Sequence, residues 1–208
     1  MPKPPVELLA GTATASIIML HGLGADGFDL APVAQALDLP DVRFILPHAE
    51  PRPVTINGGY VMPAWYDICQ PDLSREQDDA GFAQAREIVA NLIRHEIARD
   101  ISSTRIILAG FSQGGAVALY SGLTLGLPLA GIAALSAYLP QLPAAVNQTL
   151  PIWAAHGTRD DVIPLSLSQA SYARLAESQL EMHLYPMAHE ISMNEIADLR
   201  AWLQTQIG

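Results

Sequence analysis

The fold is decided by Thr104-Arg105-Ile106-Ile107-Leu108-Ala109-Gly110-Phe111-Ser112-Gln113-Gly114-Gly115 and the apolar segment that follows it. The first half of this stretch is rich in β-branched residues and predicts a buried strand, and the second half opens a helix. A sharp strand-to-helix turn holds Ser112 in a strained backbone conformation, so small residues are needed two positions before and after it. Gly110 and Gly114 meet that need. The stretch therefore predicts a nucleophile elbow.

Strand and helix patterns alternate on both sides of the elbow. Short apolar runs predict strands over residues 16–20, 42–46, 104–109, 129–135, 152–155 and 181–185. Apolar residues at spacings of three and four predict helices over residues 28–37, 79–99, 113–125, 165–178 and 193–207. This alternation predicts an α/β fold in which a mostly parallel sheet carries helices on both faces and binds ligands at the carboxyl ends of its strands.

Composition limits the class of protein. The chain has 208 residues, half of them hydrophobic, and we expect residues 1–208 to form a single domain with one large core. A net charge of -10 without a cluster of basic residues argues against nucleic-acid partners. The single cysteine, Cys69, excludes an intramolecular disulfide and a cysteine-based zinc site. Residues 1–6 lack the apolar core and cleavage site of a secretory signal, so we expect a cytoplasmic protein.

Residues 106–158 contain no Asp, Glu, Lys or Arg and could be mistaken for a membrane span. Gly122, Gly126, Pro128 and Gly131 interrupt the most apolar part at positions where turns are expected. A buried helix followed by a buried parallel strand explains the pattern better, because both are apolar on all sides in an α/β protein. We therefore expect no stable membrane insertion, and the apolar excess is compatible with a homodimer.

Residues 47–78 depart from the alternation. Several prolines and Asn57-Gly58-Gly59 argue against regular elements, and loops of this length are usually functional. Met62, Trp65 and Tyr66 could form an apolar wall of a substrate site, or they could simply anchor the loop. The sequence leaves both alternatives open.

An elbow serine needs donors for an oxyanion. The helix that begins at Gln113 directs unpaired N–H groups toward Ser112, so the backbone N–H of Gln113 is one predicted donor, and its side chain is not required. A second donor is expected from the glycine-rich loop after the strand at residues 16–20, and Leu23 N–H is the candidate. A plain tight turn would also explain the glycines of this loop.

Six histidines compete for the role of the base that removes the serine proton. His189 follows the last predicted strand and precedes the last helix, which is where a base can reach the serine. His21 and His156 each precede a glycine and are expected to be hydrogen-bonded turn residues. The chain order Ser, acid, His of α/β-hydrolases requires an acid between Ser112 and His189, and the strand at residues 152–155 leads into Asp160 and Asp161. Spacing favours Asp160.

The chain resembles the small α/β-hydrolase carboxylesterases related to acyl-protein thioesterases and lysophospholipases. The motifs that carry this resemblance span nearly the whole chain: His21-Gly22-Leu23-Gly24, Leu46-Pro47-His48-Ala49, Met62-Pro63-Ala64-Trp65-Tyr66-Asp67, Gly110-Phe111-Ser112-Gln113-Gly114-Gly115, His156-Gly157 with Asp160, and His189. The resemblance implies an α/β-hydrolase fold without a large cap domain. It also implies a Ser112, Asp160 and His189 triad, selects Asp160 over Asp161, and implies oxyanion donation by Leu23 and Gln113.

The resemblance also shapes the expected substrate. Ala188 and Glu50 depart from the residues that the family often has, and Ala25-Asp26 is similar to the bacterial esterase branch. We therefore expect a serine carboxylesterase that cleaves small-molecule esters of short to medium acyl chains through an acyl-enzyme, without a metal or cofactor. The alternatives are an acyl-protein thioesterase or lysophospholipase and, in another class, a non-catalytic binding protein on a hydrolase scaffold.

Overall fold

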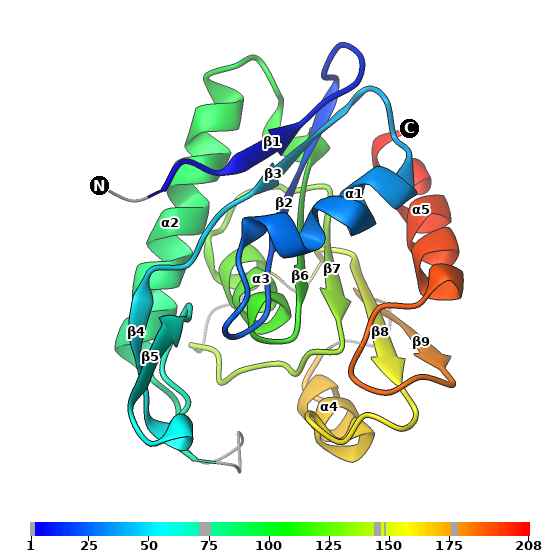
Figure 1. Ribbon diagram of the computed structural model, residues 1–208. Coiled ribbons are helices and arrows are strands. Elements are labelled where there is room, and N and C mark those ends of the chain that lie inside the picture. Colours follow the sequence, from blue (N-terminus) through cyan, green and yellow to red (C-terminus); the bar gives the residue numbers. More distant parts are fainter. Residues whose placement is uncertain (1–2, 71–75, 144–146, 148, 176–178) are drawn as a thin grey trace.

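The computed structural model describes residues 3–70, 76–143, 147, 149–175 and 179–208. A seven-stranded sheet runs through the centre in the order β1-β3-β2-β6-β7-β8-β9 (Figure 1). Its strands are β1 (Val6–Leu8), β2 (Ala15–Leu20), β3 (Val42–Leu46), β6 (Ile106–Phe111), β7 (Gly131–Leu135), β8 (Ile152–Gly157) and β9 (Leu180–Tyr185). All neighbours are parallel except β1 with β3. The prediction of a mostly parallel sheet is confirmed.

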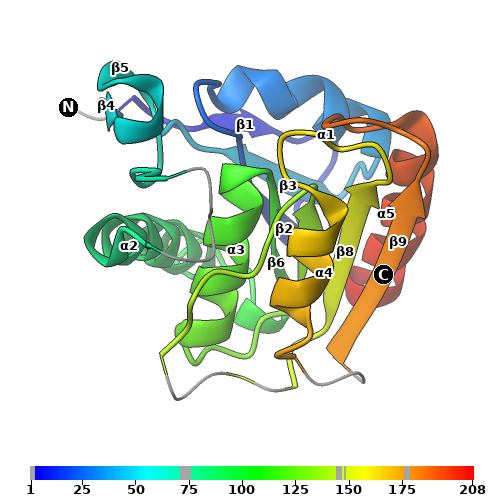
Figure 2. The same ribbon diagram turned by 90° about the horizontal axis from the view of Figure 1, so that it is seen from below.

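Two layers of helices cover this sheet (Figure 2). One face packs against α2 (Asp79–Ile97), α3 (Gln113–Thr124) and α4 (Leu165–Tyr172), and the other packs against α1 (Ala31–Leu37) and α5 (Met193–Ile207). Each face has its own apolar core, so the expectation of one core is wrong, because the sheet divides the interior into two layers. The two cores explain why the central strands are apolar on both sides. Within the described residues, no helix is long and apolar enough to cross a bilayer.

The strand order brings the loops after β2 and β6 together at one edge of the sheet. From β2 the chain moves outward to β3 and then returns to β6 on the other side of β2. The carboxyl ends of β2 and β6 are therefore adjacent and lead into loops that diverge, which creates a crevice at the switch point of the sheet. Ser112 follows β6 directly, and the loop with Leu23 follows β2.

Residues 47–78 were expected to lack regular elements, and this expectation is wrong. Residues 51–63 form an antiparallel hairpin of β4 (Pro51–Val54) and β5 (Tyr60–Pro63), joined by the short 3-10 turn η2 (Thr55–Asn57), while residues 71–75 lie outside the described part of the chain. A two-stranded hairpin has two free edges, so its prolines can occupy positions that need no ladder donor. Gly58 and Gly59 have φ values of 65° and 80° and close the turn.

Other differences concern the ends of elements. The edge strand β1 was not predicted, because three residues are too few to show a pattern. The helix expected from residue 28 begins as the 3-10 turn η1 (Gly27–Leu30) before α1, and a second such turn, η3 (Ser103–Arg105), precedes β6. The helix expected over residues 165–178 ends at Tyr172 in the structure, and residues 176–178 lie outside the described part of the chain.

Candidate active site

Ser112 occupies a strained turn between β6 and α3. Its φ of 54° and ψ of -118° are rare for a residue with a side chain, and its N–H donates to Leu135 O at 2.9 Å. A Cβ atom on Gly110 would lie 2.3 Å from Gly114 O, and one on Gly114 would lie 2.1 Å from Leu20 O. Glycine is therefore required on both sides of the serine by backbone contacts, in agreement with the predicted elbow.

The structure brings the three predicted catalytic side chains into contact. Ser112 Oγ lies 2.9 Å from His189 Nε2, and His189 Nδ1 lies 2.7 Å from Asp160 Oδ2. The Asp160 side chain is fully buried, whereas the His189 side chain is 14% exposed. Because the carboxylate can only accept, Nδ1 carries the proton and Nε2 is free to accept one from the serine hydroxyl.

The second oxygen of Asp160 is held by the backbone. Val162 N–H donates to Asp160 Oδ1 at 3.0 Å, and Ile163 N–H donates to the same atom at 2.8 Å. The neighbouring Asp161, which the sequence left open as the acid, is exposed to solvent. The geometry therefore places only Asp160 against the imidazole.

Both predicted oxyanion donors lie at the switch point. Gln113 is the first residue of α3, so its N–H has no intrahelical acceptor. Leu23 N–H has no acceptor among the described residues, while the neighbouring Gly24 N–H donates to Pro63 O at 2.9 Å. Gly24 has a φ of 78°, which favours glycine and shapes this turn.

The Gln113 side chain has a role that the sequence analysis did not assign. Its Oε1 accepts from Trp65 N–H at 2.9 Å, and its Nε2 donates to Tyr66 O at 2.8 Å. The side chain is buried, so these bonds fix the segment after β5 against the elbow. The sequence offered one hint: position 113 carries a side-chain amide, although only its backbone N–H was expected to have a role.

His21 and His48 support the loops around the elbow. His21 Nε2 accepts from Ala49 N–H at 3.0 Å, and the Trp65 indole N–H donates to His21 O at 2.9 Å. Burial lowers the pKa of His21, so this imidazole is neutral near pH 7. His48 Nδ1 accepts from Gly27 N–H at 3.1 Å.

Comparison with known proteins identifies the family. The family model described as Phospholipase/Carboxylesterase matches residues 2–207. The chain belongs to this family. Acyl-protein thioesterase 1 of Mycosarcoma maydis is 39% identical over 220 residues, which cover 93% of this chain and 92% of the relative. Acyl-protein thioesterase 1 of Cryptococcus neoformans is 36% identical over 217 residues, which cover 91% of each chain.

Solved structures agree with this assignment. Zea mays acyl-protein thioesterase 2 superposes with a TM-score of 0.84 at 30% identity and covers 98% of this chain and 99% of its own. Arabidopsis thaliana SOBER1 gives a TM-score of 0.84 at 29% identity and covers 93% and 99%. This member of the phospholipase/carboxylesterase family thus has the α/β-hydrolase fold and is a hydrolase of ester or thioester bonds.

The three residues predicted to bind substrate lie in different surroundings. Trp65 and Tyr66 are each 2% exposed, and the hydrogen bonds of Trp65 are to protein groups. Met62 is half-buried, and its Sδ would lie 3.6 Å from a Cβ atom on Gly24, beside the predicted oxyanion loop. These contacts favour the anchoring alternative for Trp65 and Tyr66, whereas Met62 lies beside the predicted oxyanion loop.

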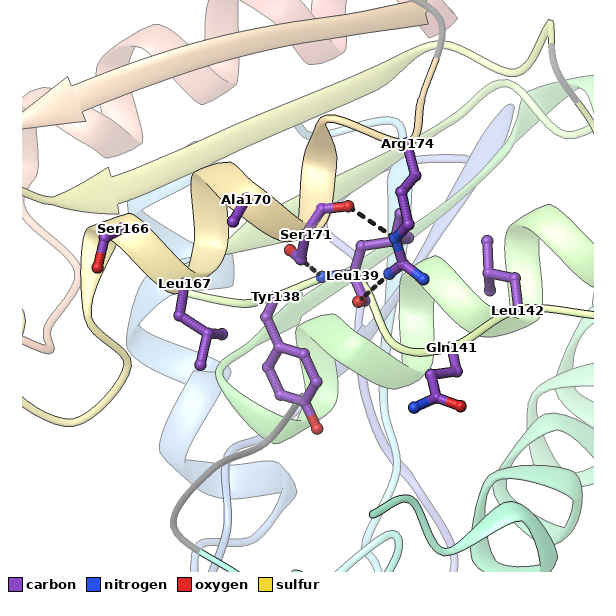
Figure 3. Close-up of a pocket in the computed structure, with 9 residues that line it drawn as sticks. All are labelled: Tyr138, Leu139, Gln141, Leu142, Ser166, Leu167, Ala170, Ser171 and Arg174. Atoms are coloured by element: carbon purple, nitrogen blue, oxygen red, sulfur yellow. Dashed lines mark hydrogen bonds between the residues drawn. The ribbon is translucent and has the colours of Figure 1, made fainter. Parts of the chain in front are cut away.

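A cavity of about 740 Å³ lies between α4 and the segment after β7 (Figure 3). Its walls include Leu139, Leu142 and Leu167, and Arg174 closes one side by donating to Leu139 O and Ser171 O. Tyr138 lines the cavity, and its hydroxyl lies 2.9 Å from that of Tyr66. Since Gln113 donates to Tyr66 O, a short series of contacts joins this cavity to the elbow. Ser112, Asp160 and His189 are not among its lining residues.

Proposed function

We propose that this family member is a serine hydrolase that cleaves acyl thioesters and long-chain carboxylic esters, as an acyl-protein thioesterase or lysophospholipase does. The observation that carries the proposal is the contact of Ser112 with His189 and of His189 with Asp160 at the switch point of the sheet. The relatives at 36–39% identity are acyl-protein thioesterases, which favours this substrate class over the short-to-medium esters expected from Ala25-Asp26.

In the proposed reaction, Ser112 Oγ attacks the acyl carbonyl carbon while its proton moves to His189 Nε2. The electron pair of the carbonyl moves to oxygen, and the oxyanion accepts hydrogen bonds from Leu23 N–H and Gln113 N–H. Collapse of this intermediate breaks the bond to the leaving sulfur or oxygen, which takes the proton from His189.

Hydrolysis of the acyl-enzyme repeats these steps with water. His189 Nε2 removes a proton from water, the hydroxide attacks the acyl carbon, and the Ser112 oxygen leaves with that proton as the free acid is released. Asp160 keeps the Nδ1–H of the imidazole directed toward itself in both halves. Each proton transfer is assigned to a side chain, so the scheme uses no metal ion or cofactor.

The acyl chain is proposed to occupy the cavity beside α4. Its volume of about 740 Å³ falls within the range of ligand sites, and three leucines line it. Tyr66 lies between the elbow and this cavity through its contacts with Gln113 and Tyr138, and Met62 lies beside the predicted oxyanion loop at Gly24.

Substitution of the nucleophile tests the reaction class. Ser112→Ala should lower kcat/KM for an aryl ester on the order of 10⁵-fold, because removing the nucleophile disables the whole triad. The exposed Ser102→Ala is the matched control and should keep wild-type kinetics. A fluorophosphonate probe should label wild type and not Ser112→Ala. Failure to label folded wild type would favour the non-catalytic binding protein.

Acyl-chain profiling tests the substrate class. With acyl thioesters and aryl esters of four to sixteen carbons, we expect kcat/KM to peak at twelve carbons or more. Leu167→Trp should move the peak to shorter chains, because the larger ring fills the cavity (Figure 3). Gln169→Trp is the control, since Gln169 is exposed two residues further along α4. A peak below eight carbons would restore the short-to-medium-chain esterase.

A further inference from the structure

A second buried histidine lies against the acid of the proposed triad. His156 is the fifth residue of β8 and is 1% exposed. Its Nε2 lies 2.8 Å from Ile163 O and 3.4 Å from Asp160 Oδ2, the same oxygen that faces His189 Nδ1. Asp160 therefore has an imidazole on each side of its inner oxygen.

The partners of His156 fix its tautomer. Ile163 O and Asp160 Oδ2 both lack a proton to donate, so Nε2 must carry one and direct it toward them. His156 Nδ1 has no hydrogen-bond partner in the described part of the chain. The contacts of the ring therefore satisfy the tautomer that carries its hydrogen on Nε2.

This N–H acts on Asp160 in two ways. Its bond to Ile163 O fixes the turn whose own N–H groups, from Val162 and Ile163, hold Asp160 Oδ1. Its positive end also faces Asp160 Oδ2 and withdraws part of the negative potential that would otherwise act on the imidazole of His189.

We propose that His156 is a positioning residue for hydrolysis, which orients the Asp160 carboxylate and limits how strongly that carboxylate holds the protonated form of His189. The proposal rests on the proposed function, because it assigns His189 as the base. The other charged groups of this turn, Arg159 and Asp161, are both exposed, and Arg159 donates to Pro186 O. Asp160 Oδ2 therefore faces the imidazoles of His156 and His189.

Two substitutions separate this role from a purely structural one. His156→Leu keeps a similar volume but removes the N–H, so kcat/KM should fall about 10- to 100-fold as Asp160 shifts away from its productive position. The carboxylate then faces His189 with more negative potential, and the acid limb of the pH profile of kcat/KM should move to higher pH. His156→Gln retains an N–H at a similar reach and should restore most of the activity and the wild-type position of that limb.

Stability and pH-profile measurements distinguish a folding defect from loss of the proposed positioning role. Urea unfolding measures the folded fraction of each variant, and rates are expressed per folded molecule. Wild-type kinetics in His156→Leu, or an activity loss in both variants without movement of the acid limb, would overturn the proposal. If His156→Leu does not fold, His156→Gln decides alone: an altered limb in this donor-retaining variant contradicts the role. An inactive wild type would instead contradict the proposed function.

Discussion

Asp160 and Glu96 are two buried carboxylates at opposite ends of the same sheet. Asp160 follows the carboxyl end of β8, and Glu96 lies in the last turn of α2, near the amino ends of β2 and β3. Both side chains have no exposed surface, and both oxygens of each accept hydrogen bonds. The chemical nature of the donors is what separates them.

Glu96 is held by a hydroxyl and by two guanidinium groups that stay charged. It accepts from Ser16 Oγ, from Arg43 at 2.7 Å and from Arg99 at 3.0 Å. Asp160 is held by backbone N–H groups and by imidazoles, one of which must gain and lose a proton in the proposed reaction. A buried acid with guanidinium partners stabilises a structure, whereas one with a titratable partner can take part in chemistry.

The largest effect expected from this contrast is on activity. Asp160→Asn should lower kcat/KM about 10⁴-fold, because the amide no longer holds the imidazole in the tautomer that accepts the serine proton. The free energy of unfolding should change much less, since the amide is isosteric. Asp161→Asn is the control and should keep wild-type rates, as Asp161 is exposed. Equal losses in the two variants would mean that the acid has been misassigned.

The second effect is on stability. Glu96→Gln should lower the free energy of unfolding by on the order of 3 kcal/mol, because it leaves Arg43, with a side chain 13% exposed, without its counter-charge. Activity per folded molecule should be unchanged. Glu87→Gln is the control on the same helix: its pair with Arg94 is 59% exposed on both sides and should contribute under about 1 kcal/mol. Denaturant titration measures both.

The lowered pKa of Glu96 predicts in which direction pH changes the stability difference between wild type and Glu96→Gln. Burial alone would raise the pKa of Glu96, but hydrogen bonds from Ser16 and Arg43 and the charge of Arg43 lower it overall. A lowered pKa contributes stability above the pKa of the unfolded chain, about 4.3, and this is lost as pH falls through the folded value. The difference in free energy of unfolding between wild type and Glu96→Gln should therefore be largest at neutral pH and decrease on acidification. A difference that increased on acidification would contradict the ion-pair explanation.

The two carboxylates also differ in how far the sequence could find them. Asp160 was found because local signals identify it: a strand before it, and a chain order of Ser, acid, His that limits the candidates. Glu96 gave no such signal, since Ser16 lies 80 residues away and only the fold brings them together. The bridge from Gln113 to Trp65 spans 48 residues and was missed for the same reason. Motifs show local geometry, but they do not show which distant groups satisfy a buried side chain.

Glu195 is a third buried carboxylate, and it sharpens the contrast because it has no cationic hydrogen-bond partner among the described residues. One oxygen accepts from Ser192 N–H at 3.1 Å in the capping box of α5, and Oε1 has no partner in the part of the chain that the structure describes. Burial raises its pKa from 4.5 to about 7, although the Ser192 bond opposes the shift. An acid with a raised pKa contributes stability below its unfolded pKa and loses it as pH rises toward 7.

Glu195→Gln should therefore nearly match wild type at pH 4 and exceed its free energy of unfolding at pH 8 by on the order of 3 kcal/mol. The amide oxygen can still accept from Ser192 N–H, so the cap is kept and only the cost of ionising a buried carboxyl is removed. Glu50→Gln is the control, because Glu50 is exposed, and it should change the free energy of unfolding little at either pH. Urea unfolding at both pH values measures the differences. A variant less stable than wild type at pH 8 would show that the ionised carboxylate stabilises α5, as Glu96 stabilises the other end of the sheet.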